Sequence, residues 1–292
     1  MNLRVAIEQT NPRLGDVHAN LQDHMTRIDR AHAEGAQLVV FPELSLTGYF
    51  LKDQVFELGM GLDHPVLKEI AARSKDISIV VGFVERTREE RFYNTLAFFE
   101  DGKLIGAHRK VHLVSYGMFD EARDFAAGQE FCTIESKLGR FGPLICEDFW
   151  HVTGGYLYFL DNVDALLVTS ASPARGVGPG GEGLESQRSW STLLSSAALM
   201  YRTWVLYAGR VGWEDGIGFG GCSAVYEPGG ALRESLPGIE EGHLDLKLEA
   251  AALRRARVET PLRRDEKPWI LKRGLERHRI TDHGPLKQRD EQ

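Results

Sequence analysis

The first forty residues constrain the fold most, because they carry the pattern of a strand, a helix and a second strand. An apolar run at residues 3–8 is followed by apolar side chains at helical spacing over 17–31 and by a continuous apolar run at 38–41. A β-α-β unit of this kind implies a parallel pair of strands with the helix covering one face. The sequence therefore predicts an α/β fold.

The same two patterns recur along the chain and extend the predicted fold. Turn residues at Asp101-Gly102 and at 228–230 indicate hairpins, which makes the predicted sheet mixed rather than purely parallel. The segment 174–183 contains five glycines and is predicted as a loop. Helices are predicted over 64–75, 156–160 and 185–200, and strands over 77–84, 93–99, 131–134, 141–146, 165–169 and 203–208. From residue 250 the charge-rich sequence predicts a short helix and an extended tail.

Composition excludes several classes of protein. A net charge of −7 and a pI near 5.8 argue against a nucleic-acid binder, and no apolar segment reaches membrane-spanning length. The chain begins with a strand pattern rather than a signal peptide. Its three cysteines, Cys132, Cys146 and Cys222, are too few and odd in number for a disulfide framework. We therefore expect a cytoplasmic protein.

Three candidate reactive groups lie at or near the ends of predicted strands: Glu43, Lys110 and Cys146. A cysteine nucleophile needs a base to take its proton, and a carboxylate can do this. A nearby lysine favours the thiolate and can stabilise an oxyanion, and the backbone N–H of Glu147 is a second oxyanion donor. Each residue also has an ordinary alternative: a loop acid, a surface lysine or a core cysteine.

Three short blocks resemble the signatures of the nitrilase (carbon–nitrogen hydrolase) superfamily, in the same order and at similar separation. They are Phe41-Pro42-Glu43-Leu44, the block from His108 to Leu113, and Leu144-Ile145-Cys146-Glu147-Asp148. The resemblance extends over nearly all of residues 1–247. It implies an α-β-β-α sandwich with mixed sheets and helices on the outer faces, which pairs through a helical face into homodimers or larger homo-oligomers.

The resemblance also implies roles for individual residues. Glu43 is expected to be the general base, Cys146 the nucleophile and Lys110 the stabiliser of the tetrahedral intermediate. The family has a second glutamate between the lysine and the cysteine, which matches Glu121 best, with Asp120 as the rival. No metal and no organic cofactor is implied.

Within the superfamily the sequence is most similar to the glutaminase domain of glutamine-dependent NAD synthetases. The similar stretches are 45–49, 116–121, 146–150 and 170–173. By this likeness, Tyr116, Trp150 and Ser172 are expected to line a pocket for a small amino-acid-like amide, together with Glu147. Those enzymes carry an ATP-using domain with a Ser-Gly-Gly-x-Asp-Ser loop, which nothing in this chain matches. The resemblance thus supports amidase chemistry but not NAD synthesis.

The sequence therefore predicts a carbon–nitrogen hydrolase domain over residues 1–250 and a C-terminal extension over 251–292 that packs on the domain or at an oligomer interface. The expected reaction is hydrolysis of a glutamine-like or ω-amide through a thioester, with release of ammonia. N-carbamoyl amino acids and nitriles are alternative substrates.

Two other readings stay open. His108 and His112 share strand parity with Lys110, so the three side chains could project on one face and suggest a metal site, although hydrogen-bonded strand histidines are the simpler reading. A catalytically silent binding or regulatory subunit on the same fold is the alternative from a different class.

Overall fold

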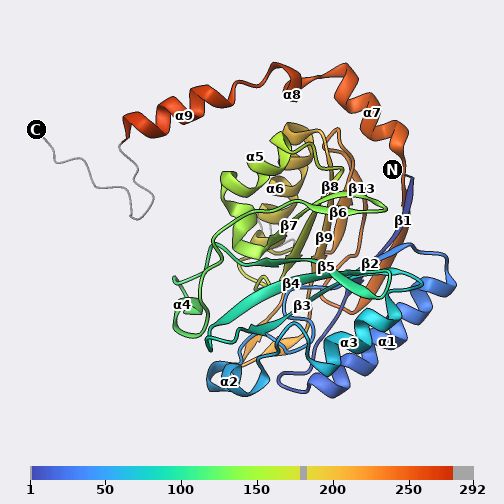
Figure 1. Ribbon diagram of the computed structural model, residues 1–292, viewed down its shortest axis with the longest axis vertical. Coiled ribbons are helices and arrows are strands. Elements are labelled where there is room, and N and C mark those ends of the chain that lie inside the picture. The colour runs from blue at the N-terminus through green and yellow to red at the C-terminus, as the bar shows by residue number, and fades with distance from the viewer. Residues whose placement is uncertain (1, 178–182, 279–292) are drawn as a thin grey trace, which may run out of the picture.

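The computed structural model describes residues 2–177 and 183–278 as two sheets packed face to face, with helices outside (Figure 1). The first sheet has the order β14 (Gly242–Leu248), β1 (Leu3–Gln9), β2 (Leu38–Val40), β3 (Ser78–Arg86), β4 (Phe92–Glu100) and β5 (Lys103–Arg109). The second has the order β13 (Leu232–Ser235), β12 (Ala224–Tyr226), β9 (Trp204–Gly209), β8 (Ala165–Ser170), β7 (Gly139–Ile145) and β6 (Ile134–Ser136). A short hairpin joins β10 (Trp213–Glu214) to β11 (Ile217–Gly218).

Two helices cover each outer face. The first sheet is covered by α1 (Val17–Ala33) and α3 (Pro65–Arg73), and the second by α5 (Val152–Leu160) and α6 (Glu185–Tyr201). Short helical segments lie in the connections: η1 (Lys52–Gln54), α2 (Val55–Leu58), α4 (Glu121–Asp124) and η2 (Cys146–Trp150). The predicted α-β-β-α sandwich with mixed sheets is confirmed. Within the described residues, no helix is both long and apolar enough to cross a membrane.

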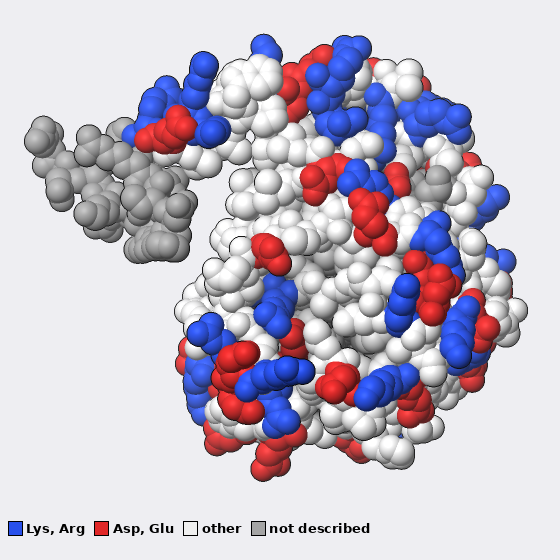
Figure 2. Space-filling model, in the orientation of Figure 1, with Lys and Arg blue, Asp and Glu red and all other residues white. Residues whose placement is uncertain are grey.

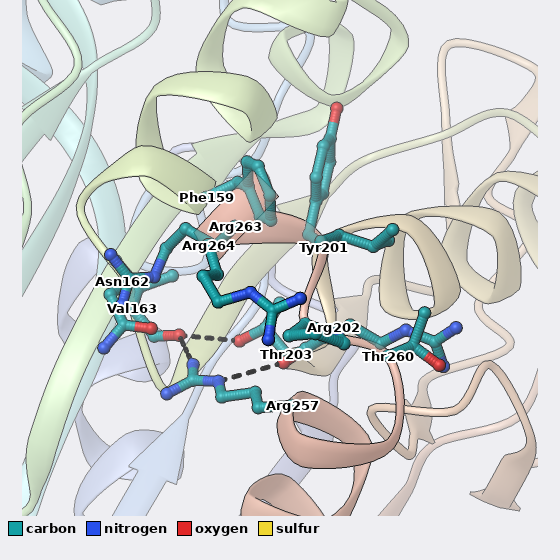
Figure 3. Close-up of a pocket in the computed structure, with 12 residues that line it drawn as sticks. Phe159, Asn162, Val163, Tyr201, Arg202, Thr203, Arg257, Thr260, Arg263 and Arg264 are labelled. Carbon is teal, nitrogen blue, oxygen red and sulfur yellow. Dashed lines mark hydrogen bonds between the residues drawn. The ribbon is translucent and has the colours of Figure 1, made fainter. Parts of the chain in front are cut away.

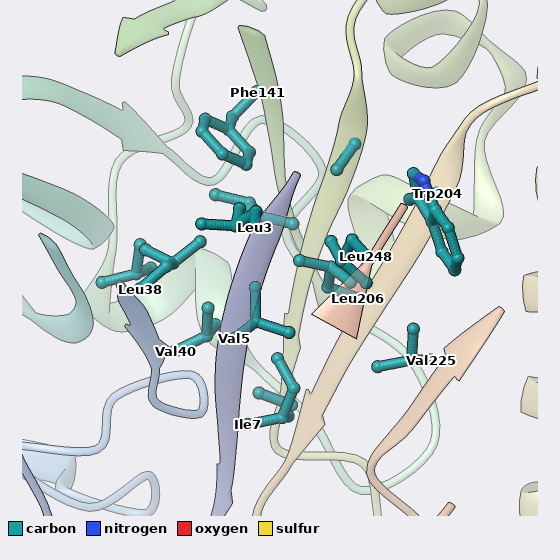
Figure 4. Close-up of a cluster of buried hydrophobic side chains, with 14 of the residues drawn as sticks. Leu3, Val5, Ile7, Leu38, Val40, Phe141, Trp204, Leu206, Val225 and Leu248 are labelled. Atoms are coloured by element: carbon teal, nitrogen blue, oxygen red, sulfur yellow. The ribbon is translucent and has the colours of Figure 1, made fainter. Parts of the chain in front are cut away.

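The strands are continuous apolar runs in the sequence because successive side chains point to opposite faces of the sheet and both faces are buried. Val5 and Ile7 of β1 belong to the same buried cluster as Phe141 and Leu206 of the second sheet (Figure 4). Ala6, between them, instead faces the α1 and α3 layer. Because both faces of a strand are buried, both parities must be apolar. The core therefore has three apolar layers, one between the sheets and one under each pair of helices.

Most predicted elements occur, with three corrections. The strand predicted over 131–134 is instead β6, Ile134–Ser136, and Phe131 packs its ring against Tyr158. Strand β14 was not predicted, although Leu244, Leu246 and Leu248 alternate along it. The predicted loop 174–183 lies partly outside the described residues.

The third correction concerns residues 250–277, which form three helices rather than one short helix and the start of an extended tail, whereas the tail predicted beyond residue 278 lies outside the described residues. They form α7 (Ala250–Glu259), α8 (Leu262–Asp265) and α9 (Pro268–Arg277). In Figure 2, Lys and Arg side chains gather along these helices, whereas acidic and basic side chains alternate over the rest of the visible face. The many charged residues of this segment interrupt the apolar spacing from which its helices could have been predicted.

Arg257 attaches α7 to the ends of α5 and α6 (Figure 3). Its guanidinium donates to the carbonyl of Val163 at 2.5 Å and to the carbonyl of Arg202 at 3.2 Å. These carbonyls lie just beyond the C-termini of the two helices, where a cation is favourable. A cavity of about 110 Å³ remains between the three helices and α8. The extension therefore begins by packing on the second sheet's helical layer.

Candidate active site

The three predicted reactive residues follow strands of different sheets. Glu43 follows β2 and Lys110 follows β5, both of the first sheet, whereas Cys146 follows β7 of the second. Packing the sheets face to face brings these strand ends to the same region of the sandwich. Glu43 and Lys110 are fully buried, and Cys146 is partly buried.

Glu43 and Lys110 form a buried ion pair. Lys110 Nζ donates to Glu43 Oε1 at 2.8 Å. The same oxygen accepts from Asn94 Nδ2 at 2.7 Å, and Glu43 Oε2 accepts from the backbone N–H of Ala171 at 2.6 Å. Three donors from three segments therefore fix the orientation of the Glu43 carboxylate.

Glu121 holds Lys110 from the other side. Its Oε1 accepts from Lys110 Nζ at 2.7 Å and from the hydroxyl of Tyr49 at 2.5 Å, while its Oε2 accepts from the backbone N–H of Val114 at 2.9 Å. Glu121 is buried, whereas the rival Asp120 is exposed. The geometry therefore favours Glu121 over Asp120, and its catalytic role stays a prediction. An ammonium has three N–H groups, so two carboxylates leave Lys110 one to donate elsewhere.

Cys146 sits on a sharp turn between β7 and the short helix η2. Its φ of +45° lies in the left-handed region, which costs a residue other than glycine about 1–3 kcal/mol. The turn holds the thiol beside Ser170, whose hydroxyl donates to Cys146 Sγ at 3.3 Å. Strain of this kind persists only where the surroundings hold it, and such sites often belong to the chemistry.

Burial decides the charge state of these groups. Burial, together with the negative charge of Glu43, raises the pKa of the Cys146 thiol far above its usual value, although Lys110 opposes this. Lys110 therefore favours the thiolate as expected, but burial and Glu43 together outweigh its effect on the pKa of the thiol. Burial and the charge of Glu121 also raise the pKa of Glu43. A carboxylate of raised pKa is a better base for a thiol proton.

Lys110 keeps its positive charge despite its burial. Burial alone lowers the pKa of an ammonium, but Glu121 and Glu43 raise the pKa of Lys110 well above its usual value. The charged lysine is thus available to stabilise negative charge that develops nearby.

The residues predicted to line the pocket differ in their surroundings. Tyr116 is exposed, and its hydroxyl donates to the Glu147 carboxylate at 3.1 Å. Trp150 is 45% exposed and meets Trp190 edge to face. Ser172 is half-buried, and its carbonyl accepts from the N–H of Gly220 at 2.9 Å. The structure thus joins Tyr116 to Glu147, and a role for Trp150 and Ser172 in binding stays a prediction.

The alternative in which His108, Lys110 and His112 share one face is wrong, because β5 ends at Arg109 and strand parity does not continue beyond it, whereas the simpler expectation of hydrogen-bonded histidines is confirmed. Both histidines instead hydrogen-bond to the carboxylate of Asp148, at 2.8 and 3.1 Å. Across the described ranges, no group of three or more His, Cys, Asp or Glu side chains is arranged to hold a metal ion.

Sequence reasoning assigned no role to several residues that organise the site. Asn94 and Ala171 fix Glu43, Tyr49 fixes Glu121, and Ser170 contacts Cys146. Tyr49 and Ser170 lie inside stretches that resemble the family. A buried amide in a strand that is mainly apolar, such as Asn94 in β4, is the signal that could have found one of them.

Known proteins resemble this chain in sequence and in fold. Residues 4–258 match the family described as carbon-nitrogen hydrolase. The glutamine-dependent NAD(+) synthetase of Acinetobacter baylyi is 30% identical over 240 residues, which cover 82% of this chain and 43% of that protein.

Two solved structures are also similar. Glutamine-dependent NAD+ synthetase from Acinetobacter baumannii, in complex with ADP, has a TM-score of 0.77 at 29% identity and matches 87% of this chain and 47% of its own. Saccharomyces cerevisiae Nit3, a member of branch 10 of the nitrilase superfamily, has a TM-score of 0.78 at 27% identity, covering 89% of this chain and 95% of its own.

The chain spans less than half the length of the NAD synthetases that it matches, but nearly the whole of Nit3. The family match extends over most of the chain and includes Glu43, Lys110 and Cys146. The protein therefore belongs to the carbon–nitrogen hydrolase family, and it is a hydrolase of non-peptide carbon–nitrogen bonds.

Proposed function

We propose that this protein is a cysteine-dependent amidase that hydrolyses the amide of a small glutamine-like or ω-amide substrate to an acid and ammonia. One observation carries the proposal: a buried Lys110 held by Glu43 and Glu121 near the thiol of Cys146. This arrangement supplies a base, a nucleophile and a fixed positive charge at a single point.

In the first step, Glu43 accepts the thiol proton while Sγ of Cys146 bonds to the amide carbon. The carbonyl oxygen becomes negative and is held by the remaining N–H of Lys110 and by the backbone N–H of Glu147. When the intermediate collapses, the carbon–nitrogen bond breaks and Glu43 returns its proton to the leaving nitrogen. Ammonia departs and a thioester to Cys146 remains.

In the second step, water replaces ammonia. Glu43 takes a proton from the water while the water oxygen bonds to the thioester carbon. Lys110 and the backbone N–H of Glu147 hold the oxyanion again. Collapse breaks the carbon–sulfur bond, releases the acid and returns the proton to Cys146. The resting thiol and carboxylate are thereby restored. The high pKa of the thiol supports proton removal during the attack rather than before it.

The surroundings of Cys146 favour a substrate that carries an ammonium group. Glu147 follows the nucleophile directly, and its carboxylate accepts from Tyr116 and lies 3.6 Å from Nε2 of His151. A carboxylate in this position attracts a cation more than an anion. The similarity to proteins named as glutamine-dependent points to the same class of amide.

The test is ammonia release from glutamine, other ω-amides, N-carbamoyl amino acids and simple nitriles. We expect release from the ω-amide group, loss of that activity in Cys146→Ala, and full activity in Cys132→Ala, which removes an exposed thiol. Release only from carbamoyl compounds or nitriles would replace the substrate and keep the nucleophile. A protein that releases ammonia from none of these compounds would support the silent binding subunit.

We further propose that two copies associate through the α5 and α6 face. A groove of about 200 Å³ between these helices is lined mainly by apolar side chains, and Val152 and Met200 beside it are 74% and 52% exposed. Helix α9 points away from the body of the molecule (Figure 1), and none of its residues is buried. Exposed apolar patches of this kind mark interaction sites.

The three cysteines are unpaired, which fits the cytoplasmic location that we expect.

A further inference from the structure

The carboxylate of Asp148 accepts hydrogen bonds from both sheets. Its Oδ1 accepts from the backbone N–H groups of Val111 and His112 at 3.1 and 2.9 Å and from His112 Nδ1 at 3.1 Å. Its Oδ2 accepts from His108 Nε2 at 2.8 Å and from the backbone N–H of Ile145 at 3.2 Å. The side chain is completely buried.

These contacts bear directly on the two catalytic turns. Val111 follows Lys110 and Ile145 precedes Cys146, so one carboxylate binds the backbone next to both residues. Lys110 extends from the first sheet and Cys146 from the second. Asp148 therefore fixes the position of the lysine turn relative to the strained thiol turn.

Hydrogen-bond donors stabilise the buried negative charge of Asp148. Although burial by itself raises the pKa of a carboxyl group, the hydrogen bonds from His108 and His112 hold the pKa of Asp148 well below its usual range. The two imidazoles are held in turn, because both stack on Phe131 and His112 also stacks on His151 at 3.8 Å. No Lys or Arg forms an ion pair with Asp148 within the described part of the chain.

We propose that Asp148 is a positioning residue that sets the distance between the Lys110 ammonium and the Cys146 thiol. It contacts neither substrate nor the reacting atoms, and it acts through the backbone on either side of it. The proposal rests on the amidase function proposed above. It predicts that weakening the hydrogen bonds to the Asp148 carboxylate slows the chemical steps more than it weakens substrate binding.

Asp148→Asn is the direct test, because asparagine keeps the shape but presents an N–H to at least one of the present donors. Glu100→Gln is the matched control. Glu100 is a buried carboxylate that also joins the two sheets, through Ser78 and Ser136, but away from the catalytic residues. We expect kcat in Asp148→Asn to fall about 100-fold with KM within about threefold of wild type, because small misplacements of reacting groups have effects of this size.

A second readout needs no substrate. Alkylation of Cys146 by iodoacetamide, followed by mass spectrometry across a pH series, reports the state of the thiol. Moving Lys110 away removes its stabilisation of the thiolate. In Asp148→Asn we therefore expect slower alkylation than in wild type at every pH of the series, with the pH dependence displaced to higher pH. This readout separates a failure of positioning from a failure of the amidase proposal, because it proceeds even if no substrate is hydrolysed.

If Asp148→Asn does not fold, His112→Phe and His112→Asn take its place. Phenylalanine keeps the stacking but removes the Nδ1 donor, whereas asparagine restores a donor near the same position. We expect slow alkylation in His112→Phe and recovery in His112→Asn. The proposal is overturned if kcat and the alkylation profile of Asp148→Asn match those of Glu100→Gln, or if the two His112 variants behave alike.

Discussion

Asn94 donates its side-chain amide to Oε1 of Glu43 at 2.7 Å, on the same oxygen that accepts from Lys110. The amide oxygen of Asn94 is buried and, among the described residues, has no hydrogen-bond partner. Leaving a buried carbonyl without a partner costs about 1–3 kcal/mol. The orientation of Asn94 therefore lowers the stability of the fold while it directs the side-chain N–H toward the proposed base.

Asn94→Ala should therefore reduce activity much more than stability. A hydrogen bond to a charged group contributes about 1.5–3 kcal/mol, so we expect kcat to fall about 10- to 100-fold. Asn20→Ala is the control, because Asn20 is an equally buried amide that bonds Arg13 and Leu46 instead. Steady-state kinetics and thermal unfolding decide the outcome. A rise in KM at unchanged kcat would assign Asn94 to binding instead.

The acid limb of the pH profile should report Glu43. The base must be ionised, so activity is lost as the pH falls through the pKa of Glu43, which burial and the charge of Glu121 raise. Glu121→Gln removes that like charge, so the limb of kcat/KM should move to lower pH while kcat falls. Exposed Glu69→Gln should leave the profile unchanged. A limb that stays in place would mean that another group sets it.

Local sequence pattern was enough to identify some residues of the site, whereas others required knowledge of burial. Glu43, Lys110 and Cys146 stand beside apolar runs that mark strand ends, so local pattern and family likeness were enough to select them. The choice of Glu121 over Asp120 required burial, which differs between neighbours in sequence.

The partners of these residues could not be predicted in the same way. Ala171 reaches Glu43 across 128 positions, and Asp148 reaches Val111 across 37. Such pairings follow from how two sheets stack, which no local period encodes. The net direction of the pKa shift of Cys146 could not be predicted for the same reason, because it depends on a burial that outweighs the neighbouring lysine. Strand β14 was different, since its alternating leucines were visible in the sequence.

The proposed dimer predicts that a charge in the α5 and α6 groove separates the copies. Met200→Glu should halve the mass measured by light scattering at micromolar concentration, because a carboxylate would be buried at the interface. Leu232→Glu is a suitable control, since Leu232 is also 52% exposed but lies on β13, away from the groove. A wild-type protein that is monomeric at every concentration would contradict the proposal.

Gly82 shows how the backbone itself positions the base. The turn that carries Glu43 crosses β3 so closely at Gly82 that a β-carbon there would lie 2.4 Å from the backbone nitrogen of Leu44 and 2.7 Å from the carbonyl oxygen of Pro42. Both neighbours are backbone atoms, which cannot rotate away. Any side chain at position 82 must therefore displace the turn.

Gly82→Ala should accordingly lower stability and activity together. Overpacking of this kind costs about 1–3 kcal/mol, and the displaced turn carries Glu43 away from Lys110 and Cys146. Gly229→Ala is the control, because a β-carbon at Gly229 meets nothing within 4 Å. Denaturant unfolding should show the loss of stability only in Gly82→Ala, and kcat measured well below its unfolding temperature should fall about 100-fold. Unchanged kcat in a destabilised Gly82→Ala would show that the position of Glu43 does not depend on this crossing.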